Sequence, residues 1–283
     1  MAPPSASSAL APAPARPHGS VARCAAVGVV AGFLSGLFGV GGGILIVPAL
    51  VLVLKFDQRL AHGTSLAAVL PIAISSLTSY AIDDKVDWTV GALLAVGAIG
   101  GAVIGTHILH RLPHDALAAA FSLLLVVTAV RLILDDSDAG GRAALSLIGT
   151  VALILIGLLA GILAGLLGVG GGIIMVPAMV VAFGVPAAVA KGTSLLVIVP
   201  TAVMGTWRNR TKKNADMRVA AILGLAGVVS AFLGGVISVG MSEGLSNALF
   251  ATLLILVATR MIWQLVSSRR RRDELPGSAV SGA

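Results

Sequence analysis

The sequence predicts an all-α integral membrane protein made of two tandem homologous helical repeats, with about eight to ten membrane segments. Three observations predict this fold class: few charged residues, long uncharged stretches and an internal repeat. Of the 283 residues, 57% are hydrophobic and 11% are charged, whereas a soluble domain carries about 25% charged residues. Uncharged stretches of twenty or more residues are typical of transmembrane helices, and they leave little sequence for a soluble domain.

The repeat is found by aligning the sequence with itself so that Gly36 falls on Gly165. This alignment, called here the repeat register, places the segment 36–44, GLFGVGGGI, on the segment 165–173, GLLGVGGGI, and it needs no gap. Between Gly32 and Pro71, 20 of 40 positions are identical to their aligned counterparts. Chance similarity between apolar segments would not keep Gly, Pro, Thr and Ser in one register, so the repeat indicates two equivalent structural units.

The apolar segments and the linkers between them give the domain organisation. We predict an Ala/Pro-rich disordered start at 1–21, a first repeat at 22–138, a second repeat at 142–268 and a basic cytoplasmic tail at 269–283. The apolar segments of the first repeat are 24–55, 60–81, 89–109 and 115–134, and those of the second are 143–184, 187–207, 218–240 and 244–266.

The first segment of each repeat is too long for one crossing. Residues 24–54 carry no charge, and a straight helix of that length would run about 46 Å, against a hydrocarbon core of about 30 Å. Each segment holds a glycine triplet and, five residues beyond it, a proline: Pro48 or Pro177. Glycine runs and proline interrupt helices, so we expect a broken helix, either a re-entrant hairpin or two crossings. An odd number of crossings per repeat would invert one repeat relative to the other, which is the arrangement we favour.

The charges of the loops bear on whether one repeat is inverted relative to the other. The basic loop that runs from Arg208 to Arg218 should be cytoplasmic, while its counterpart at 83–87 is acidic. The remaining loops divide Lys and Arg about evenly between the parallel and inverted models, so charge alone does not decide between them.

The glycine triplets are candidates for an anion site. Helices that begin at Ile44 and Ile173 would present free N–H groups and a positive dipole end to a substrate. Close helix packing is the alternative explanation for glycine at these positions. The residues concerned are Gly41, Gly42, Gly43, Gly170, Gly171 and Gly172.

A G-T-S motif follows in each repeat and should open the next helix. The hydroxyl groups of Thr64, Ser65, Thr193 and Ser194 would either cap that helix or donate to a substrate oxygen. Deep in the same apolar segments, Pro71 and Pro200 should kink their helices, and with Pro48 and Pro177 they are candidates for a structural or gating role.

Basic residues stand at matching positions in the two repeats. His62 and Lys191 immediately precede the G-T-S motifs, where either would place positive charge beside an anion; a solvated loop position is the interpretation we favour for both. Arg131 and Arg260 lie near the ends of the fourth segments, where we expect them to reach the lipid headgroups.

The positions of the carboxylates bear on the charge of the substrate. All 12 acidic residues lie in predicted loops, the linker or the tail, or, in the case of Asp115, at the very edge of a segment, whereas cation carriers and proton relays usually need a carboxylate inside the membrane. His107 and His110 are too few for a metal site, and Cys24 is the only cysteine, so no metal or other cofactor is expected. A nucleophile–base pair could be made only by His62 with Ser65, and Lys191 replaces this histidine in the second repeat, so an enzyme is disfavoured.

The doubled pattern GxxGVGGGxxxVP, followed by GTS and a proline, resembles the sulfite exporter TauE/SafE family of membrane permeases. The resemblance extends from Gly32 to about Trp263. It implies a multi-pass permease of the bacterial inner membrane that carries a small anion: sulfite, sulfoacetate, thiosulfate or another organosulfonate.

Four alternatives remain beside an anion carrier: an anion channel on the same fold, a carrier of a non-sulfur organic acid, a cation carrier, and a membrane-anchored interaction or sensor protein. The short loops weigh against the last of these. The expected partners are the anion and membrane lipid, not nucleic acid, because the basic residues flank apolar segments. A homodimer would fit if Gly97, Gly101 and Gly105 faced a second copy, although they would equally pack helices within one subunit.

Overall fold

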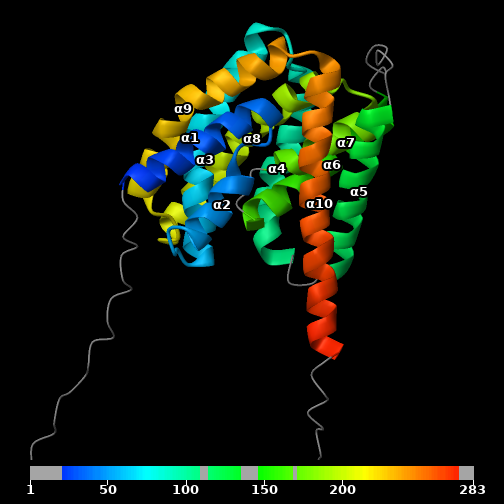
Figure 1. Ribbon diagram of the computed structural model, residues 1–283. Helices are drawn as coiled ribbons and strands as arrows, with labels where there is room; N and C mark the ends of the chain where they lie inside the picture. Colours follow the sequence, from blue (N-terminus) through cyan, green and yellow to red (C-terminus); the bar gives the residue numbers. More distant parts are fainter. Residues whose placement is uncertain (1–20, 109–113, 135–145, 168–170, 274–283) are drawn as a thin grey trace, which may run out of the picture.

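The computed structural model describes residues 21–108, 114–134, 146–167 and 171–273 (Figure 1). Within these ranges the chain forms helices and no strands. The helices are α1 (Val21–Phe38), α2 (Gly43–Leu52), α3 (Gln58–Ile82), α4 (Trp88–Ile108), α5 (His114–Leu134), α6 (Leu147–Leu167), α7 (Gly172–Phe183), α8 (Ala187–Thr211), α9 (Met217–Gly240) and α10 (Glu243–Asp273).

The helices follow the repeat. The repeat register relates α1 to α6, α2 to α7, α3 to α8, α4 to α9 and α5 to α10. Every predicted apolar segment contains a helix, and the first segment of each repeat contains two, so the tandem organisation is confirmed.

Two predicted segment ends are wrong because helices continue through basic residues. Helix α8 runs to Thr211, so Arg208 and Arg210 lie on its last turn and not in a loop. Helix α10 runs to Asp273, beyond the predicted segment end at 266, and continues through the arginine run 269–272. Arginine is a good helix former, and its charge is favourable at a helix C-terminus, so neither helix has a reason to end earlier.

The first helix of each repeat packs on the fourth helix of the other repeat, not of its own. Gly28 of α1 lies against the backbone of Leu223 in α9, and Gly36 lies against that of Ala231. Residue numbers increase in the same direction along the two helices, so α1 and α9 run parallel. The equivalent contacts of α6 with α4 join Gly157 to Leu94 and Gly161 to Ala98.

These directions make α1 and α2 a hairpin. Helix α3 also runs parallel to α9, because Gly224 lies against Ala68 and Gly235 lies against Ser79 further along both helices. Since α1 and α3 therefore point the same way, α2 must return towards the end at which α1 began. The same reasoning applies to α6, α7 and α8, because Gly91 of α4 contacts the start of α8 while the Arg208 guanidinium donates to the carbonyl oxygen of Ala102. The predicted broken helix is thus a hairpin in both repeats.

The equivalent helices α3 and α8 run antiparallel in the centre of the molecule. Gly63, near the start of α3, packs against the carbonyl of Asn214 just after α8. Gly192, near the start of α8, packs against the carbonyl of Lys85 just after α3. An antiparallel pair of equivalent helices is the geometry that inverted repeats produce.

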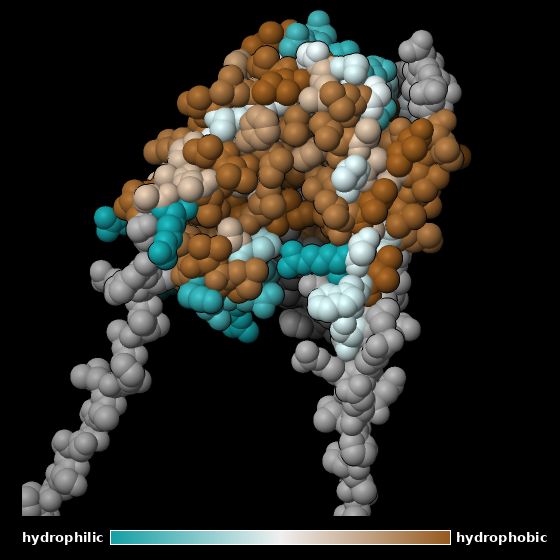
Figure 2. All heavy atoms as spheres, in the orientation of Figure 1, coloured by the Kyte–Doolittle hydropathy of each residue, from teal (hydrophilic) through white to brown (hydrophobic). Residues whose placement is uncertain are grey.

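The outer surface is suited to lipid. Among the described residues, six helices are long and apolar enough to cross a membrane: α1, α3, α6, α8, α9 and α10. Many large apolar side chains are exposed on them, including Leu225, Val229 and Leu256. Figure 2 shows a broad hydrophobic band around the molecule, with hydrophilic side chains gathered at its upper and lower ends. The chain is therefore a multi-pass membrane protein.

Candidate functional site

The break in each hairpin is made by glycines in a left-handed conformation. Gly39, Gly41 and Gly42 have φ values of 67°, 78° and 70°, and Gly171 has 74°. Residues with a Cβ rarely adopt this region, so only glycine makes the turn without strain. Gly42 and Gly171 are the N-cap residues of α2 and α7, which begin one residue earlier than we predicted.

The start of α2 is buried and carries free donors. The N–H groups of Leu45 and Ile46 both donate to the carbonyl oxygen of Gly42, so the amides of Gly43 and Ile44 precede the first helical bonds. Gly41, Gly42 and Gly43 are all buried. This is the geometry needed for an anion cradle, and the role of the glycines in binding remains a prediction. In the second repeat Gly170 falls outside the described residues.

The glycine breaks of the two repeats meet beside α8. A Cβ on Gly39 would lie 2.6 Å from the Cα and Cβ of Lys191, and a Cβ on Gly172 would lie 2.9 Å from the carbonyl oxygen of Gly39. The hydroxyl of Ser194 donates to that same carbonyl oxygen and to the carbonyl oxygen of Lys191 at 2.7 Å. The structure thus brings together Gly39, Gly172, Lys191 and Ser194 from both repeats.

The four prolines lie inside helices and do not end them. Pro48 is within α2 and Pro177 within α7, so each broken segment is interrupted at its glycines and not at its proline. Pro71 lies within α3 and Pro200 within α8, and both helices are continuous across them.

The prediction that the G-T-S motifs open their helices is wrong, and with it the alternative that their hydroxyls cap those helices. Helix α3 begins at Gln58, where Asp57 is the N-cap and its carboxylate accepts from the N–H of Arg59 at 3.0 Å. Helix α8 begins at Ala187, after the N-cap Pro186. The motifs therefore lie more than one turn inside their helices.

The threonines instead join the two repeats. The Thr64 hydroxyl oxygen accepts from the backbone N–H of Asp216 at 3.0 Å, and that of Thr193 accepts from the N–H of Asp87 at 2.9 Å. Asp87 and Asp216 in turn accept from the first amides of α4 and α9. Each threonine is fully buried, so it fixes the N-terminus of a helix from the opposite repeat.

Because of this contact, we expect a threonine substitution to lower stability and to leave anion affinity unchanged. Thr193→Val leaves the part-buried N–H of Asp87 without its acceptor, which costs about 1–3 kcal/mol. We expect a lower midpoint of thermal unfolding and an unchanged apparent affinity for the anion, measured by a fluorescence melting assay and by transport in vesicles. Thr252→Val is the control, since Thr252 is exposed and its hydroxyl bonds within its own helix to Ala248. Weaker affinity at unchanged stability would instead assign Thr193 to substrate binding.

Lys191 is the charged residue that the structure buries most completely. Its exposed fraction is 1%, and it lies in the first turns of α8, so our prediction of a solvated loop position is wrong. Nζ donates to the hydroxyl oxygen of Ser246 at 2.8 Å and lies 5.1 Å from the centre of the Phe250 ring. No carboxylate pairs with it among the residues that the structure describes. His62, its counterpart, also lies inside a helix, in the first turns of α3, and is half-buried.

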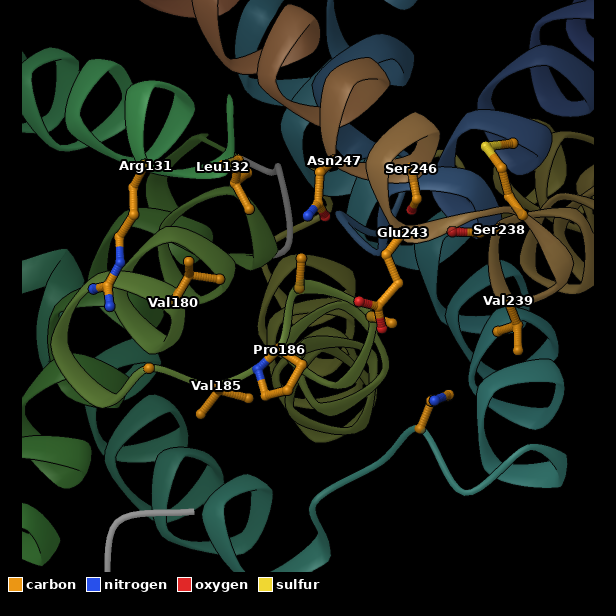
Figure 3. A pocket seen from close by; sticks show the side chains of 15 residues that line it. Arg131, Leu132, Val180, Val185, Pro186, Ser238, Val239, Glu243, Ser246 and Asn247 are labelled. Carbon is orange, nitrogen blue, oxygen red and sulfur yellow. The ribbon is translucent and has the colours of Figure 1, made fainter. Parts of the chain in front are cut away.

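A cavity of about 200 Å³ opens next to this lysine. It lies where α5 and α10 face the start of α8 and the turn between α3 and α4 (Figure 3). The lining side chains that carry charge or hydrogen-bonding groups are Lys85, Arg131, Ser238, Glu243, Ser246 and Asn247. Ser246 is in the wall, and Lys191 is bonded to it from behind, so the cavity has a buried cation immediately beyond one wall.

Arg131 and Arg260 are equivalent in the repeat register but have different surroundings. Arg131 lines the cavity, and its guanidinium donates to the carbonyl oxygen of Val181 at 2.8 Å. The prediction that Arg131 extends to the lipid headgroups is therefore wrong. Arg260 is exposed on α10. Figure 3 shows Arg131 on α5 across the cavity from Ser246 and Asn247 on α10.

Sequence reasoning missed the α10 residues of this cavity. Ser246, Asn247 and Glu243 have no special spacing, and the repeat register gives Ser246 an apolar counterpart, Leu117. A usable signal was the adjacent polar pair Ser246 and Asn247 near the start of an apolar segment, one turn before Phe250.

Comparison with known proteins agrees with the sequence pattern. The family model for the sulfite exporter TauE/SafE family matches residues 4–150 and 153–283. The chain belongs to this family. The chain is therefore a TauE/SafE membrane transporter, and placement in a bacterial inner membrane agrees with its apolar surface.

Relatives of this TauE/SafE protein carry similar names. YunE of Bacillus subtilis strain 168, a probable membrane transporter protein, is 27% identical over 270 residues, which cover 86% of this chain and 97% of YunE. A probable membrane transporter protein of Xylella fastidiosa strain 9a5c is 36% identical over 113 residues, covering 39% of this chain and 43% of the relative. One from Methanocaldococcus jannaschii is 29% identical over 116 residues, covering 38% and 43%. No solved structure matches this chain.

Proposed function

We propose that this protein is a secondary carrier that exports a small sulfur-containing anion: sulfite, sulfoacetate, thiosulfate or another organosulfonate. The observation that carries the proposal is the buried Lys191 behind the wall of the cavity. A buried charge is costly unless it is paired, and no described carboxylate pairs with this one. A substrate anion would supply the missing charge.

The other charges around the cavity support an anion. Lys85 and Arg131 line it together with one carboxylate, Glu243, so with Lys191 the cations outnumber the anions. Within the described helices, Asp and Glu occupy only the first and last turns. A cation carrier would need carboxylates nearer the middle of the membrane.

The antiparallel packing of α3 and α8 supports inverted repeats, with the basic end of α8 on the cytoplasmic side. In this orientation the cavity, which adjoins the start of α8, faces the opposite side of the membrane. The glycine breaks lie deeper, next to Lys191. We propose that the anion passes between these two regions.

Counterflow in vesicles tests the function. Purified protein is reconstituted, and uptake of radiolabelled sulfite and of radiolabelled sulfoacetate is measured with and without unlabelled anion inside. Saturable uptake that preloading accelerates is the expected result for a carrier. Uptake without acceleration by preloading would show a channel. Folded protein that moves neither anion would contradict the proposed substrate class and direct the search to non-sulfur organic acids; protein-free vesicles are the control.

A further inference from the structure

Helices α5 and α10 pack chiefly on each other, and their buried faces, including Leu125 and Phe250, join the apolar cluster formed with the other helices. Among the described residues, α5 packs otherwise on α7. The remaining long helices are joined more closely, through the glycine contacts of α1 with α9 and α4 with α6 and through the two threonine bonds. We call helices α1, α3, α4, α6, α8 and α9 the core.

The cavity lies along the boundary between this pair and the core. One side of its lining comes from α5 and α10, including Arg131 and Asn247, and the other from the core and the adjoining loops, including Lys85 and Ser238 (Figure 3). A cavity at such a boundary changes its volume when the pair moves.

Among the described residues, two polar contacts beside the cavity attach the pair to other helices: Arg131 of α5 donates to the carbonyl oxygen of Val181 in α7, and Lys191 of α8 donates to Ser246 of α10. The second joins the pair to a core helix and is buried. Ser246 is 6% exposed and Lys191 is 1% exposed. The apolar contact next to it, between the rings of Phe38 and Phe250, has a centroid separation of 6.2 Å. An anion in the cavity would compete with Ser246 for Lys191, whereas it could not replace an apolar contact.

Access to Lys191 requires its contact with Ser246 to change. Ser246 stands between the ammonium group and the cavity, so an anion can reach Nζ directly only when the hydroxyl is displaced. An ammonium group prefers an anionic oxygen to a neutral hydroxyl, because charge-assisted hydrogen bonds between two ions are stronger.

Building on the proposed function, we propose that the Lys191–Ser246 hydrogen bond is a latch. It holds the α5–α10 pair against the core when no anion is bound, and the arriving anion replaces Ser246 on Lys191 and frees the pair to move. Ser246 is thus a positioning residue that links occupancy of the site to conformation. Ser246 acts by holding α10 in place, whereas Lys191 supplies the positive charge that binds the anion.

The test measures the position of α10 without any substrate. Cys24 is replaced by Ser, and spin labels are placed on two exposed residues, Ile82 at the end of α3 and Leu245 at the start of α10. Pulsed electron resonance then gives the distance distribution. In anion-free protein, we expect Ser246→Ala to broaden and lengthen this distribution, and Ser246→Thr, which keeps the hydroxyl, to restore it.

Two controls make the result specific. Thr252→Ala removes an exposed hydroxyl from the same helix and should leave the distribution unchanged. A label pair within the core, Ile82 with Leu233 of α9, should not respond to Ser246→Ala. An Ile82–Leu245 distribution that is the same in Ser246→Ala and in the parent protein would overturn the latch, whatever anion is transported. Failure of sulfite counterflow alone would overturn only the substrate class.

Discussion

Lys191→Met should reduce transport of the anion by more than a hundredfold while the protein stays folded. Removing one partner of a buried charge pair costs about 3–5 kcal/mol, and in the carrier the second partner is the substrate. Methionine has a similar length and an apolar tail, so it can fill the space between Gly39 and the Phe250 ring. Because the free protein no longer buries an uncompensated charge, its midpoint of thermal unfolding should hold or rise.

This combination of lost transport and retained stability separates binding from structure. The measurements are initial uptake rates in vesicles and melting curves of the purified variant. Lys212→Met is the matched control, since Lys212 is exposed at the far end of α8 and should leave both values unchanged. A Lys191→Met protein that transports normally would remove the charge argument for an anion site. One that fails to fold would show that Lys191 mainly holds α10 in place.

The repeat explains why most of the fold could be predicted from the sequence. A long uncharged segment with a glycine triplet cannot cross a bilayer as one straight helix, so the breaks between α1 and α2 and between α6 and α7 follow from length and backbone chemistry. The packing between repeats does not follow in this way. The repeat register states which helices are equivalent, and says nothing about whether α1 contacts α4 or its equivalent α9.

The candidate site shows the same limit at the level of side chains. Lys191 was identified because it stands beside a repeated motif, but its burial depends on Gly39 and Phe250, which are distant in sequence. For Thr64 the sequence leaves a choice between capping its own helix and contacting the substrate, whereas the partner of its hydroxyl is the N–H of Asp216 in the other repeat. Local patterns locate hydroxyl groups and charges, and only the tertiary arrangement shows what each one faces.

Neighbouring glycines in α4 should respond in opposite ways to the same substitution. A Cβ on Gly101 would collide with the carbonyl oxygen of Leu158 and lie 2.9 Å from the amide nitrogen of Ile162, whereas the nearest atom to a Cβ on Gly100 is Cδ1 of Leu158 at 3.7 Å. Overpacking of this kind costs about 1–3 kcal/mol, and backbone atoms cannot move aside as a side chain can. Gly101→Ala should therefore lower the midpoint of thermal unfolding by several degrees, and Gly101→Leu should prevent recovery of folded protein.

Gly100→Ala is the matched control because both changes gain the same helix propensity, about 1 kcal/mol in favour of alanine. It should leave the unfolding midpoint unchanged or raise it. The pair also bears on oligomerisation, because Gly101 and Gly97 pack on α6 of their own chain and therefore provide no free face for a second copy. Equal stability of Gly101→Ala and Gly100→Ala would show that α4 and α6 do not meet backbone to backbone in the membrane. These glycines would then be available to a partner subunit, and a homodimer through α4 would become the arrangement to test.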